Sequence, residues 1–184
     1  MDIKIESTSI SFSEKSQAFF QLLKMRLTLL VVFSAAMTYL LASSAVVDWT
    51  VMTGLILGGI MITGSANILN QIKEVEFDRL MKRTQNRPLP LEKLTKTEAL
   101  VFAVILLLLG FILQFLTVNP LCAGLSLLSL VLYAFVYTPL KRVGPIAVFV
   151  GAFPGAMPPL IGWVAFSDAI TTEAWILFGI QFTW

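Results

Sequence analysis

The chain has 184 residues, of which 57% are hydrophobic and only 13% are charged, whereas about 25% are charged in an ordinary soluble domain. This composition excludes a soluble globular protein and predicts an integral membrane protein. The net charge of +2 is too small to indicate nucleic-acid binding, the single cysteine, Cys122, excludes an internal disulfide framework, and the lack of histidine excludes histidine-based metal sites.

Residues 1–20 are polar and serine-rich, and we expect them to form a cytoplasmic tail that becomes helical near Glu14. A mitochondrial presequence would be rich in arginine, but the first arginine here is Arg26. The segment therefore favours the inner (plasma) membrane of a bacterium over a mitochondrial membrane.

Five apolar runs are long enough to cross a membrane as helices. They cover residues 27–47, 51–72, 99–118, 121–140 and 146–166, and a sixth run begins near Ala174. Because most connections are short, consecutive helices should pack as antiparallel neighbours in an all-α, polytopic membrane bundle that forms a single domain. Only the connection over 73–98 is long, and we expect it to be a cytoplasmic loop that carries the active site.

The basic residues fix the expected orientation. All 13 precede the first span, lie between the second and third spans, or follow the fourth span. These positions share one side of the membrane, which the positive-inside rule assigns to the cytoplasm together with the amino terminus.

The most charged stretch, residues 67–90, begins at the end of the second apolar run. At the helical period Asn70, Glu74 and Asp78 share one face, whereas Glu76 points to the opposite side. Neighbouring carboxylates at a membrane boundary are unfavourable unless a cation lies between them. Since Mg²⁺ takes one or two carboxylates and completes its shell with phosphate oxygens and water, the three residues are candidate metal ligands. A solvated loop of mixed charge is the alternative.

Basic side chains accompany this face. Lys82, Arg83 and Arg87 supply cations and hydrogen-bond donors for a diphosphate. The fourth span ends on the same side with Tyr137, Lys141 and Arg142, where Pro139 is expected to stop the helix so that the two cations fold over a cavity mouth. Ordinary anchoring at the membrane interface is the alternative for these residues.

Two further features concern the interior of the spans. Pro154, Pro158 and Pro159 in the fifth span predict a broken helix that lines a cavity, with a kink for packing as the alternative. Gln114, a polar residue in the third span, is expected to hydrogen-bond to a neighbouring helix.

The pattern Asn-x-x-x-Glu-x-x-x-Asp over residues 70–78, followed by Lys82-Arg83-Thr84 and Asn86-Arg87-Pro88-Leu89, resembles the first aspartate-rich motif of intramembrane prenyltransferases of the UbiA type. The resemblance implies that Asn70, Glu74 and Asp78 hold Mg²⁺ and act in catalysis. It also implies a set of residues that bind the isoprenyl diphosphate: Lys82, Arg83, Arg87, Tyr137, Lys141 and Arg142.

Residues 137–142 and 151–163 are similar to segments of the haem O synthase family. That resemblance implies transfer of a farnesyl group from farnesyl diphosphate to a vinyl group of haem b, which yields haem O for terminal oxidases. It also suggests contacts with haem-handling or oxidase-assembly membrane proteins.

Three alternatives remain at this point. The acceptor could be an aromatic ring or a quinone precursor, or the chain could be a transporter that uses the fifth span. The third is an inactive fragment, because the last apolar run covers only 11 residues, Ala174 to Trp184, or about 16 Å of helix. The family's second aspartate-rich motif has no candidate here, so we expect a chain that retains the first diphosphate half-site and is inactive by itself.

Overall fold

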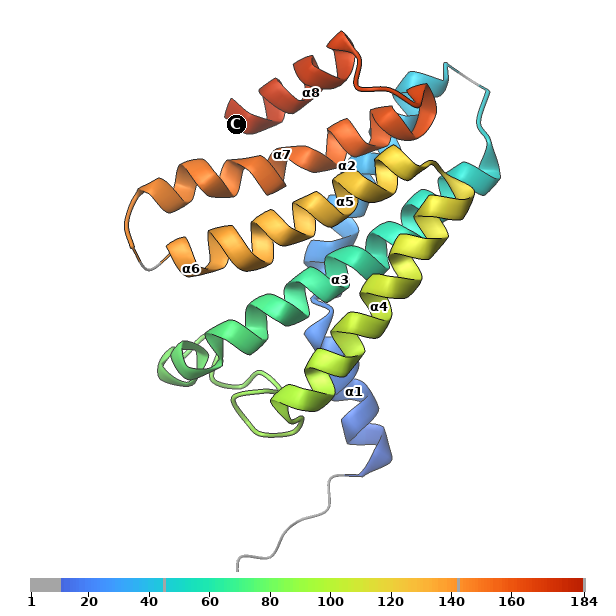
Figure 1. Ribbon diagram of the computed structural model, residues 1–184. Coiled ribbons are helices and arrows are strands. Elements are labelled where there is room, and N and C mark those ends of the chain that lie inside the picture. The colour runs from blue at the N-terminus through green and yellow to red at the C-terminus, as the bar shows by residue number, and fades with distance from the viewer. Residues whose placement is uncertain (1–10, 45, 142, 184) are drawn as a thin grey trace, which may run out of the picture.

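The computed structural model describes residues 11–44, 46–141 and 143–183, and in these parts every regular element is a helix (Figure 1). In chain order they are α1 (Phe12–Leu22), α2 (Met25–Ser43), α3 (Trp49–Leu80), α4 (Lys96–Thr117), α5 (Pro120–Val131), the π-helix η1 (Leu132–Tyr137), α6 (Thr138–Leu140), α7 (Ile146–Ser167) and α8 (Thr172–Thr183). Five segments are long and apolar enough to cross a membrane, namely α2, α3, α4, the continuous run Pro120–Leu140, and α7. The predicted all-α membrane bundle is confirmed.

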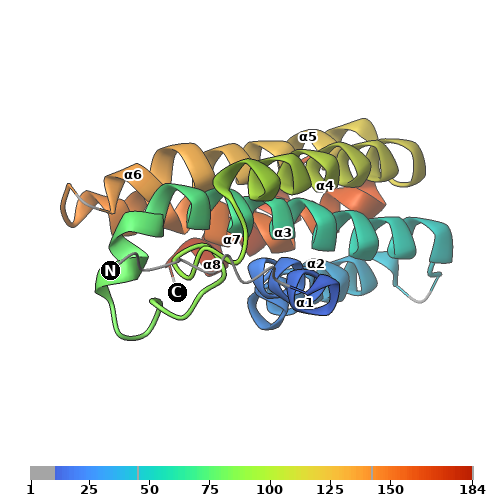
Figure 2. The same cartoon turned by 90° about the horizontal axis from the view of Figure 1, so that it is seen from below.

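Helix α3 is the centre of the bundle. Figure 2 shows it between the α1–α2 pair and the layer formed by α4 and α5. Helix α7 packs against α2 and α5, and α8 folds back against α7. The close approach of α3 and α4 depends on glycine, because a Cβ atom on Gly110 would lie 2.9 Å from the carbonyl oxygen of Gly58.

Helix α3 is also the longest element, and it extends further than the sequence predicted. Its 32 residues correspond to about 48 Å, compared with about 30 Å for the hydrocarbon core of a bilayer. The helix passes the end of the predicted apolar span at residue 72 and includes residues 73–80, as the helical spacing of Asn70, Glu74 and Asp78 requires, so the first part of the expected connection over 73–98 is helix. The connection is therefore 81–95, and it ends where Thr95 and Glu98 form a capping box at the start of α4.

The connection over 81–95 is packed against the bundle. Leu89 and Leu94 are buried in a hydrophobic cluster with Ile68 and Val75 of α3 and Ala99 of α4. This burial fixes the loop beside the charged end of α3.

The fourth span remains helical through Pro139, contrary to the prediction that this residue stops the helix. The wider π-helical turn of η1 precedes it, and the Thr138 hydroxyl donates to the Tyr133 carbonyl oxygen at 2.8 Å. The carbonyl of Ala134, five residues before Pro139, accepts a hydrogen bond from Lys73 Nζ at 3.0 Å. The acceptor is satisfied although proline has no N–H, so the helix continues to Leu140.

The expected break in the fifth span is also wrong. Helix α7 runs without interruption through Pro154, Pro158 and Pro159, all of which are buried. Each proline removes one backbone donor, while the remaining hydrogen bonds and the packing against α2 and α5 keep the helix intact.

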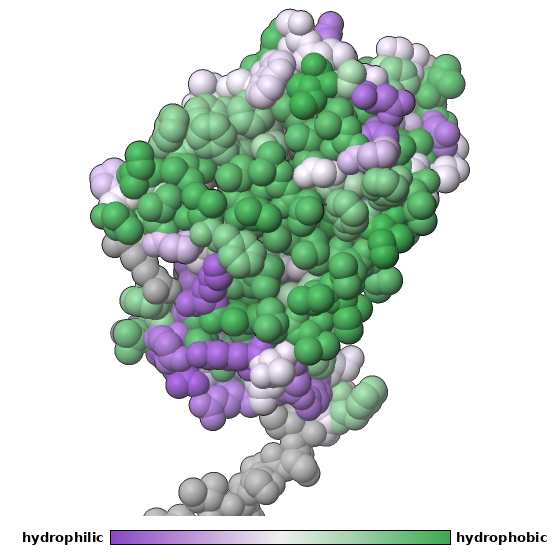
Figure 3. Space-filling view, viewed as in Figure 1, coloured by the Kyte–Doolittle hydropathy of each residue, from purple (hydrophilic) through white to green (hydrophobic). Residues whose placement is uncertain are grey.

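The surface divides by polarity along the bundle. Figure 3 shows an apolar band over the long helices and a hydrophilic patch at the lower end, near the carboxyl end of α3 and the connection that follows it. Such a band is what a lipid-facing surface requires.

Candidate active site

The site is built on one face of α3, near its carboxyl end. Asn70 and Asp78 are buried there, and Glu74 is half-buried between them. The side chain of Glu76 is 62% exposed and pairs away from this face, with Lys96 Nζ at 3.0 Å. The helix therefore separates one acidic side chain from the other two.

Each of the three side chains meets a cation that comes from a different part of the chain. The Nζ atom of Lys24 lies 3.5 Å from Oδ1 of Asn70. The other two contacts are ion pairs, Lys141 Nζ to Glu74 Oε1 at 3.3 Å and Arg87 Nη1 to Asp78 Oδ2 at 2.6 Å. We call these six residues the charged cluster: Lys24, Asn70, Glu74, Asp78, Arg87 and Lys141.

Lys24 reaches the cluster because the chain bends between α1 and α2. Its backbone is left-handed, with φ of 50°. Two polar side chains of α3 hold the bend in place. Asn67 Nδ2 donates to the Leu23 carbonyl oxygen at 3.2 Å, and Gln71 Nε2 donates to that of Leu22 at 2.7 Å.

The ammonium group of Lys24 is poorly solvated. Its pKa is lowered from 10.5 to about 8, chiefly because burial disfavours the charged form and also because Arg87 is nearby. The carboxylates of Glu74 and Asp78 oppose this shift. A buried amine with a lowered pKa is typical of a functional site.

Three basic residues of the loop after α3 were predicted to join the site: Lys82, Arg83 and Arg87. Within the described residues only Arg87 contacts the charged cluster. The Thr84 hydroxyl donates to the main-chain oxygen of Asp78 at 3.1 Å, and this turn directs Arg87 back to the Asp78 side chain. Lys82 and Arg83 are exposed, and no contact joins them to the charged cluster within the described residues. Arg142 lies outside the described residues.

Tyr137 stands at the border between the cluster and the interior of the bundle. Lys141 Nζ lies 5.3 Å from the centre of its ring, and the ring stacks on that of Tyr133 at 5.7 Å. The neighbouring Thr138 hydroxyl accepts a hydrogen bond from Asn70 Nδ2 at 3.0 Å. Residues of the fourth span are thus linked directly to the predicted metal ligands.

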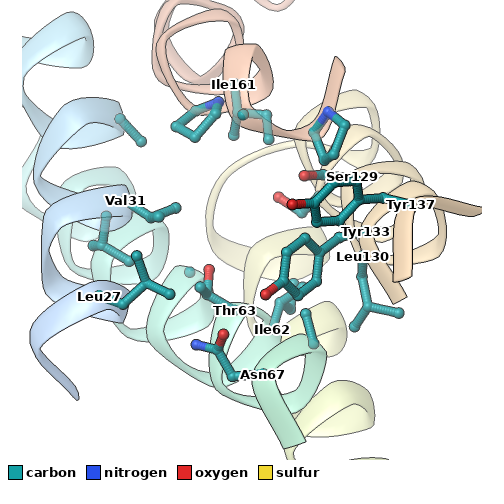
Figure 4. A pocket seen from close by; sticks show the side chains of 18 of the residues that line it. Leu27, Val31, Ile62, Thr63, Asn67, Ser129, Leu130, Tyr133, Tyr137 and Ile161 are labelled. Atoms are coloured by element: carbon teal, nitrogen blue, oxygen red, sulfur yellow. The ribbon is translucent and has the colours of Figure 1, made fainter. Parts of the chain in front are cut away.

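Behind the charged cluster lies a cavity of about 430 Å³, within the roughly 300–1,000 Å³ range of ligand pockets. We call it the inner pocket; Figure 4 shows Tyr133 and Tyr137 on one side of it, Leu27 and Val31 on the opposite side, and Asn67 and Ile161 below and above. Its walls come from α2, α3, α5, η1 and α7, and Gln114 of α4 also lines it. Most of this lining is apolar, which suits a hydrocarbon ligand.

The oxygen donors of the cluster suit a hard divalent cation. Among the described residues no group of three or more His, Cys, Asp or Glu side chains could hold a metal by itself. Glu74 and Asp78 with the Asn70 amide oxygen instead offer two carboxylates and one neutral oxygen. That set fits Mg²⁺ shared with the oxygens of a phosphate ligand.

Three residues that border this site were given no role by the sequence prediction. Asn67 stands three residues before Asn70 and shares its helix face, and Lys24 and Thr138 lie in segments 24–26 and 137–142 that resemble the family, but nothing in the sequence indicated their contacts. Gln114 was expected to hydrogen-bond to a neighbouring helix, and this is wrong, because neither of its amide atoms has a partner in the described structure.

Comparison with known proteins finds similarity over most of the chain. Residues 30–184 match the UbiA prenyltransferase family. A protoheme IX farnesyltransferase of Cytophaga hutchinsonii is 51% identical over 170 residues, covering 91% of this chain and 59% of that protein. One from Christiangramia forsetii is 42% identical over 166 residues, covering 90% of this chain and 55% of that protein. This chain thus spans just over half the length of these relatives.

A solved structure has the same fold. It comes from work on the biosynthesis of digeranylgeranylglyceryl phosphate synthase in membranes, and it superposes with a TM-score of 0.81 at 24% identity. The match covers 92% of this chain and 59% of the other.

Proposed function

The chain belongs to the UbiA prenyltransferase family, and from this premise we propose that it serves the transfer of a farnesyl group from farnesyl diphosphate to a vinyl group of haem b, which forms haem O. The names of its relatives support haem b as the acceptor. This chain would supply a diphosphate site and a pocket for the prenyl chain.

The proposal rests mainly on one observation, namely that a charged site and an apolar pocket adjoin each other. The charged cluster adjoins the inner pocket at Asn67 and Tyr137, so a ligand with an anionic head and a long apolar tail would satisfy both at once. A prenyl diphosphate has that form. A small polar substrate would leave the apolar pocket unfilled.

In the proposed reaction the cations act on the leaving group. The bond between the first prenyl carbon and the diphosphate oxygen breaks, and the diphosphate leaves with the bonding electrons. The terminal vinyl carbon of the acceptor forms the new bond, and the positive charge moves to the inner vinyl carbon, where water adds and loses a proton to give the hydroxyl group of the product. Lys24, Arg87 and Lys141 would stabilise the departing charge. The apolar walls of the inner pocket would keep water from the allylic cation until the carbon–carbon bond has formed, and water would reach the acceptor only afterwards.

Mg²⁺ is the cofactor we propose, held by Asn70, Glu74 and Asp78 together with the diphosphate. When bound, it would neutralise charge on the leaving group. Arg87 and Lys141, which pair with the carboxylates in this structure, would then be available to the diphosphate oxygens. Lys82, Arg83, Tyr137 and Arg142 remain proposed diphosphate ligands.

The proposed setting is the inner membrane of a bacterium, with the amino terminus and the connection over 81–95 in the cytoplasm. The location of the lysines and arginines supports this orientation. Membrane proteins that deliver haem or assemble oxidases are the proposed protein partners.

The test is turnover in lipid nanodiscs by a protein of the relatives' full length that carries this segment, because the 184 residues are expected to be inactive by themselves. With Mg²⁺, farnesyl diphosphate and haem b, the expected product of the longer protein is farnesylated haem, detected by mass spectrometry, and Asp78→Asn should abolish it, while the 184-residue chain should give no product. A parallel reaction with 4-hydroxybenzoate tests an aromatic acceptor. Prenylation of that acid without any change in haem b would refute haem as the acceptor.

A further inference from the structure

Lys73 is a basic residue of α3 that has no role in the proposed reaction. It immediately precedes Glu74 in the chain, but its side chain is directed to the fourth span. Its Nζ atom donates to the Ala134 carbonyl oxygen at 3.0 Å and lies 3.9 Å from the centre of the Phe135 ring. Ala134 is fully buried, so loss of the ammonium group would leave a buried acceptor without this donor, which is unfavourable.

The need for a side-chain donor at this carbonyl comes from Pro139. In the π-helical turn the N–H group of Thr138 donates to the carbonyl oxygen of Tyr133, five residues earlier. The next N–H group in the same register would donate to Ala134, but Pro139 has none. The ammonium group of Lys73 therefore takes the place of a missing main-chain donor.

This turn determines where Lys141 of the charged cluster lies. The main-chain N–H group of Lys141 donates to the Tyr137 carbonyl oxygen at 3.1 Å, so Lys141 keeps the helical register of the turn before it. From there its Nζ atom reaches Oε1 of Glu74 at 3.3 Å. Two consecutive residues of α3 thus act on either side of Pro139: Lys73 holds the backbone before it, and Glu74 pairs with the side chain after it.

The two contacts should respond differently when the ligand binds. In the proposed complex Glu74 turns to Mg²⁺ and Lys141 turns to the diphosphate, so their ion pair is lost. The contact between Lys73 and Ala134 involves neither a proposed metal ligand nor a proposed diphosphate ligand, and it can persist. The fourth span would then remain fixed to α3 while the side chain of Lys141 changes its partner.

We propose that Lys73 is a positioning residue of the diphosphate site. By replacing the N–H group that Pro139 lacks, it keeps the end of the fourth span beside α3 and presents Lys141 to the diphosphate. This inference rests on the proposed function, because it takes the charged cluster to be the diphosphate site. Lys73 itself does not contact the substrate.

The expected effect on affinity follows from the loss of one hydrogen bond. The net contribution of such a bond corresponds to about a 2- to 12-fold change in an equilibrium constant. Without the bond, only part of the molecules would hold Lys141 in the binding arrangement, and the apparent affinity falls with that fraction. Lys73→Met should therefore weaken Mg²⁺-dependent binding of farnesyl diphosphate by about 2- to 12-fold.

A second substitution separates positioning from simple attraction, since Lys73→Met also removes a positive charge. Pro139→Ala supplies an N–H group for the Ala134 carbonyl oxygen and adds no charge. In the Pro139→Ala background, Lys73→Met should therefore change the affinity less than about twofold. Lys96→Met is the matched control, because it removes another exposed lysine, which pairs with Glu76 and not with the fourth span.

The measurement is the affinity for farnesyl diphosphate with Mg²⁺ of the 184-residue protein in nanodiscs, for the parent, the three single variants and the double variant. Thermal unfolding shows which variants are folded. A loss with Lys73→Met that disappears in the Pro139→Ala background, with Lys96→Met close to the parent, supports the inference. An equal loss in both backgrounds would mean that Lys73 acts through its charge, and this result or an unchanged affinity would overturn the inference.

Two further outcomes are also decisive. If Lys73→Met does not fold, the double variant is compared with Pro139→Ala alone: equal affinities support the positioning role, and a weaker affinity or an unfolded double variant overturns it. If the parent protein binds no farnesyl diphosphate, the diphosphate site of the proposed function is refuted, and the role of Lys73 with it.

Discussion

Replacement of Asp78 by asparagine is the sharpest test of the charged face of α3, because the same helix offers a control two residues away. The Asp78 side chain is 6% exposed and contacts Arg87, whereas that of Glu76 is 62% exposed and points to the other side. Only Asp78 should therefore influence a cation bound beside Asn70 and Glu74.

The expected loss follows from the charge removed. A carboxylate and a divalent cation about 4 Å apart attract each other by about 8 kcal/mol at an effective dielectric constant of about 20. Because Arg87 offsets part of this attraction and the asparagine amide oxygen can still bind the cation, we expect Asp78→Asn to cost about 2–3 kcal/mol, or about 30- to 150-fold in the Mg²⁺ concentration that supports binding of farnesyl diphosphate. Glu76→Gln should change it less than about fivefold, since exposed charge pairs contribute at most about 1 kcal/mol.

The assay is a Mg²⁺ titration of farnesyl diphosphate binding by the parent and both variants. Asparagine can still accept a hydrogen bond from Arg87, and Thr84 bonds to the main chain of residue 78, so the loop should keep its fold. Thermal unfolding without Mg²⁺ checks that point. Equal losses for Asp78→Asn and Glu76→Gln would refute the assignment of the metal to one helix face.

Three other measurements test the orientation, the packing and the protonation of Lys24. With Cys122 replaced by alanine, Val46→Cys should react with an impermeant thiol reagent added outside and Gln85→Cys only after permeabilisation; the reverse pattern would invert the orientation. Gly110→Ala should destabilise the protein by about 1–3 kcal/mol, because the new Cβ would lie 2.8 Å from that of Met61, whereas Gly124→Ala, with nothing within 4 Å, should not; equal unfolding midpoints would contradict the packing of α3 on α4. The pKa of Lys24 is lowered to about 8, so its amine loses its charge as pH rises through 8, and the affinity for inorganic diphosphate should weaken over that range. Lys24→Met should remove this pH dependence. An affinity of the parent protein that does not change with pH would contradict the assignment of Lys24 to the diphosphate site.

The sequence was most informative where a property depends on helical geometry alone. The common face of Asn70, Glu74 and Asp78 follows from a spacing of four residues, and so does the separation of Glu76. Helical geometry gives no such guide for Lys82 and Arg83, because side-chain directions in an irregular loop depend on its turns.

Features that depend on tertiary contacts were not predictable. The bend that brings Lys24 to Asn70 is held by Asn67 and Gln71, more than 40 residues away in the chain. The helix continues past Pro139 because Lys73, from α3, satisfies a carbonyl of the fourth span. Whether the amide atoms of Gln114 find hydrogen-bond partners likewise depends on the groups that neighbouring helices place beside them.

The length of α3 links the site to the lipid around it. From Trp49, about 20 residues span a hydrocarbon core of about 30 Å, which places the boundary near Ile68, Asn70 at the level of the lipid headgroups, and Asp78 about 15 Å beyond the boundary. Because the helix is continuous, this height is fixed relative to its other end. A bilayer of longer acyl chains would draw Asn70 and Glu74 towards hydrocarbon, at a cost of fractions of a kcal/mol for each ångström of mismatch. Membrane thickness should therefore set how readily this site holds a charged ligand.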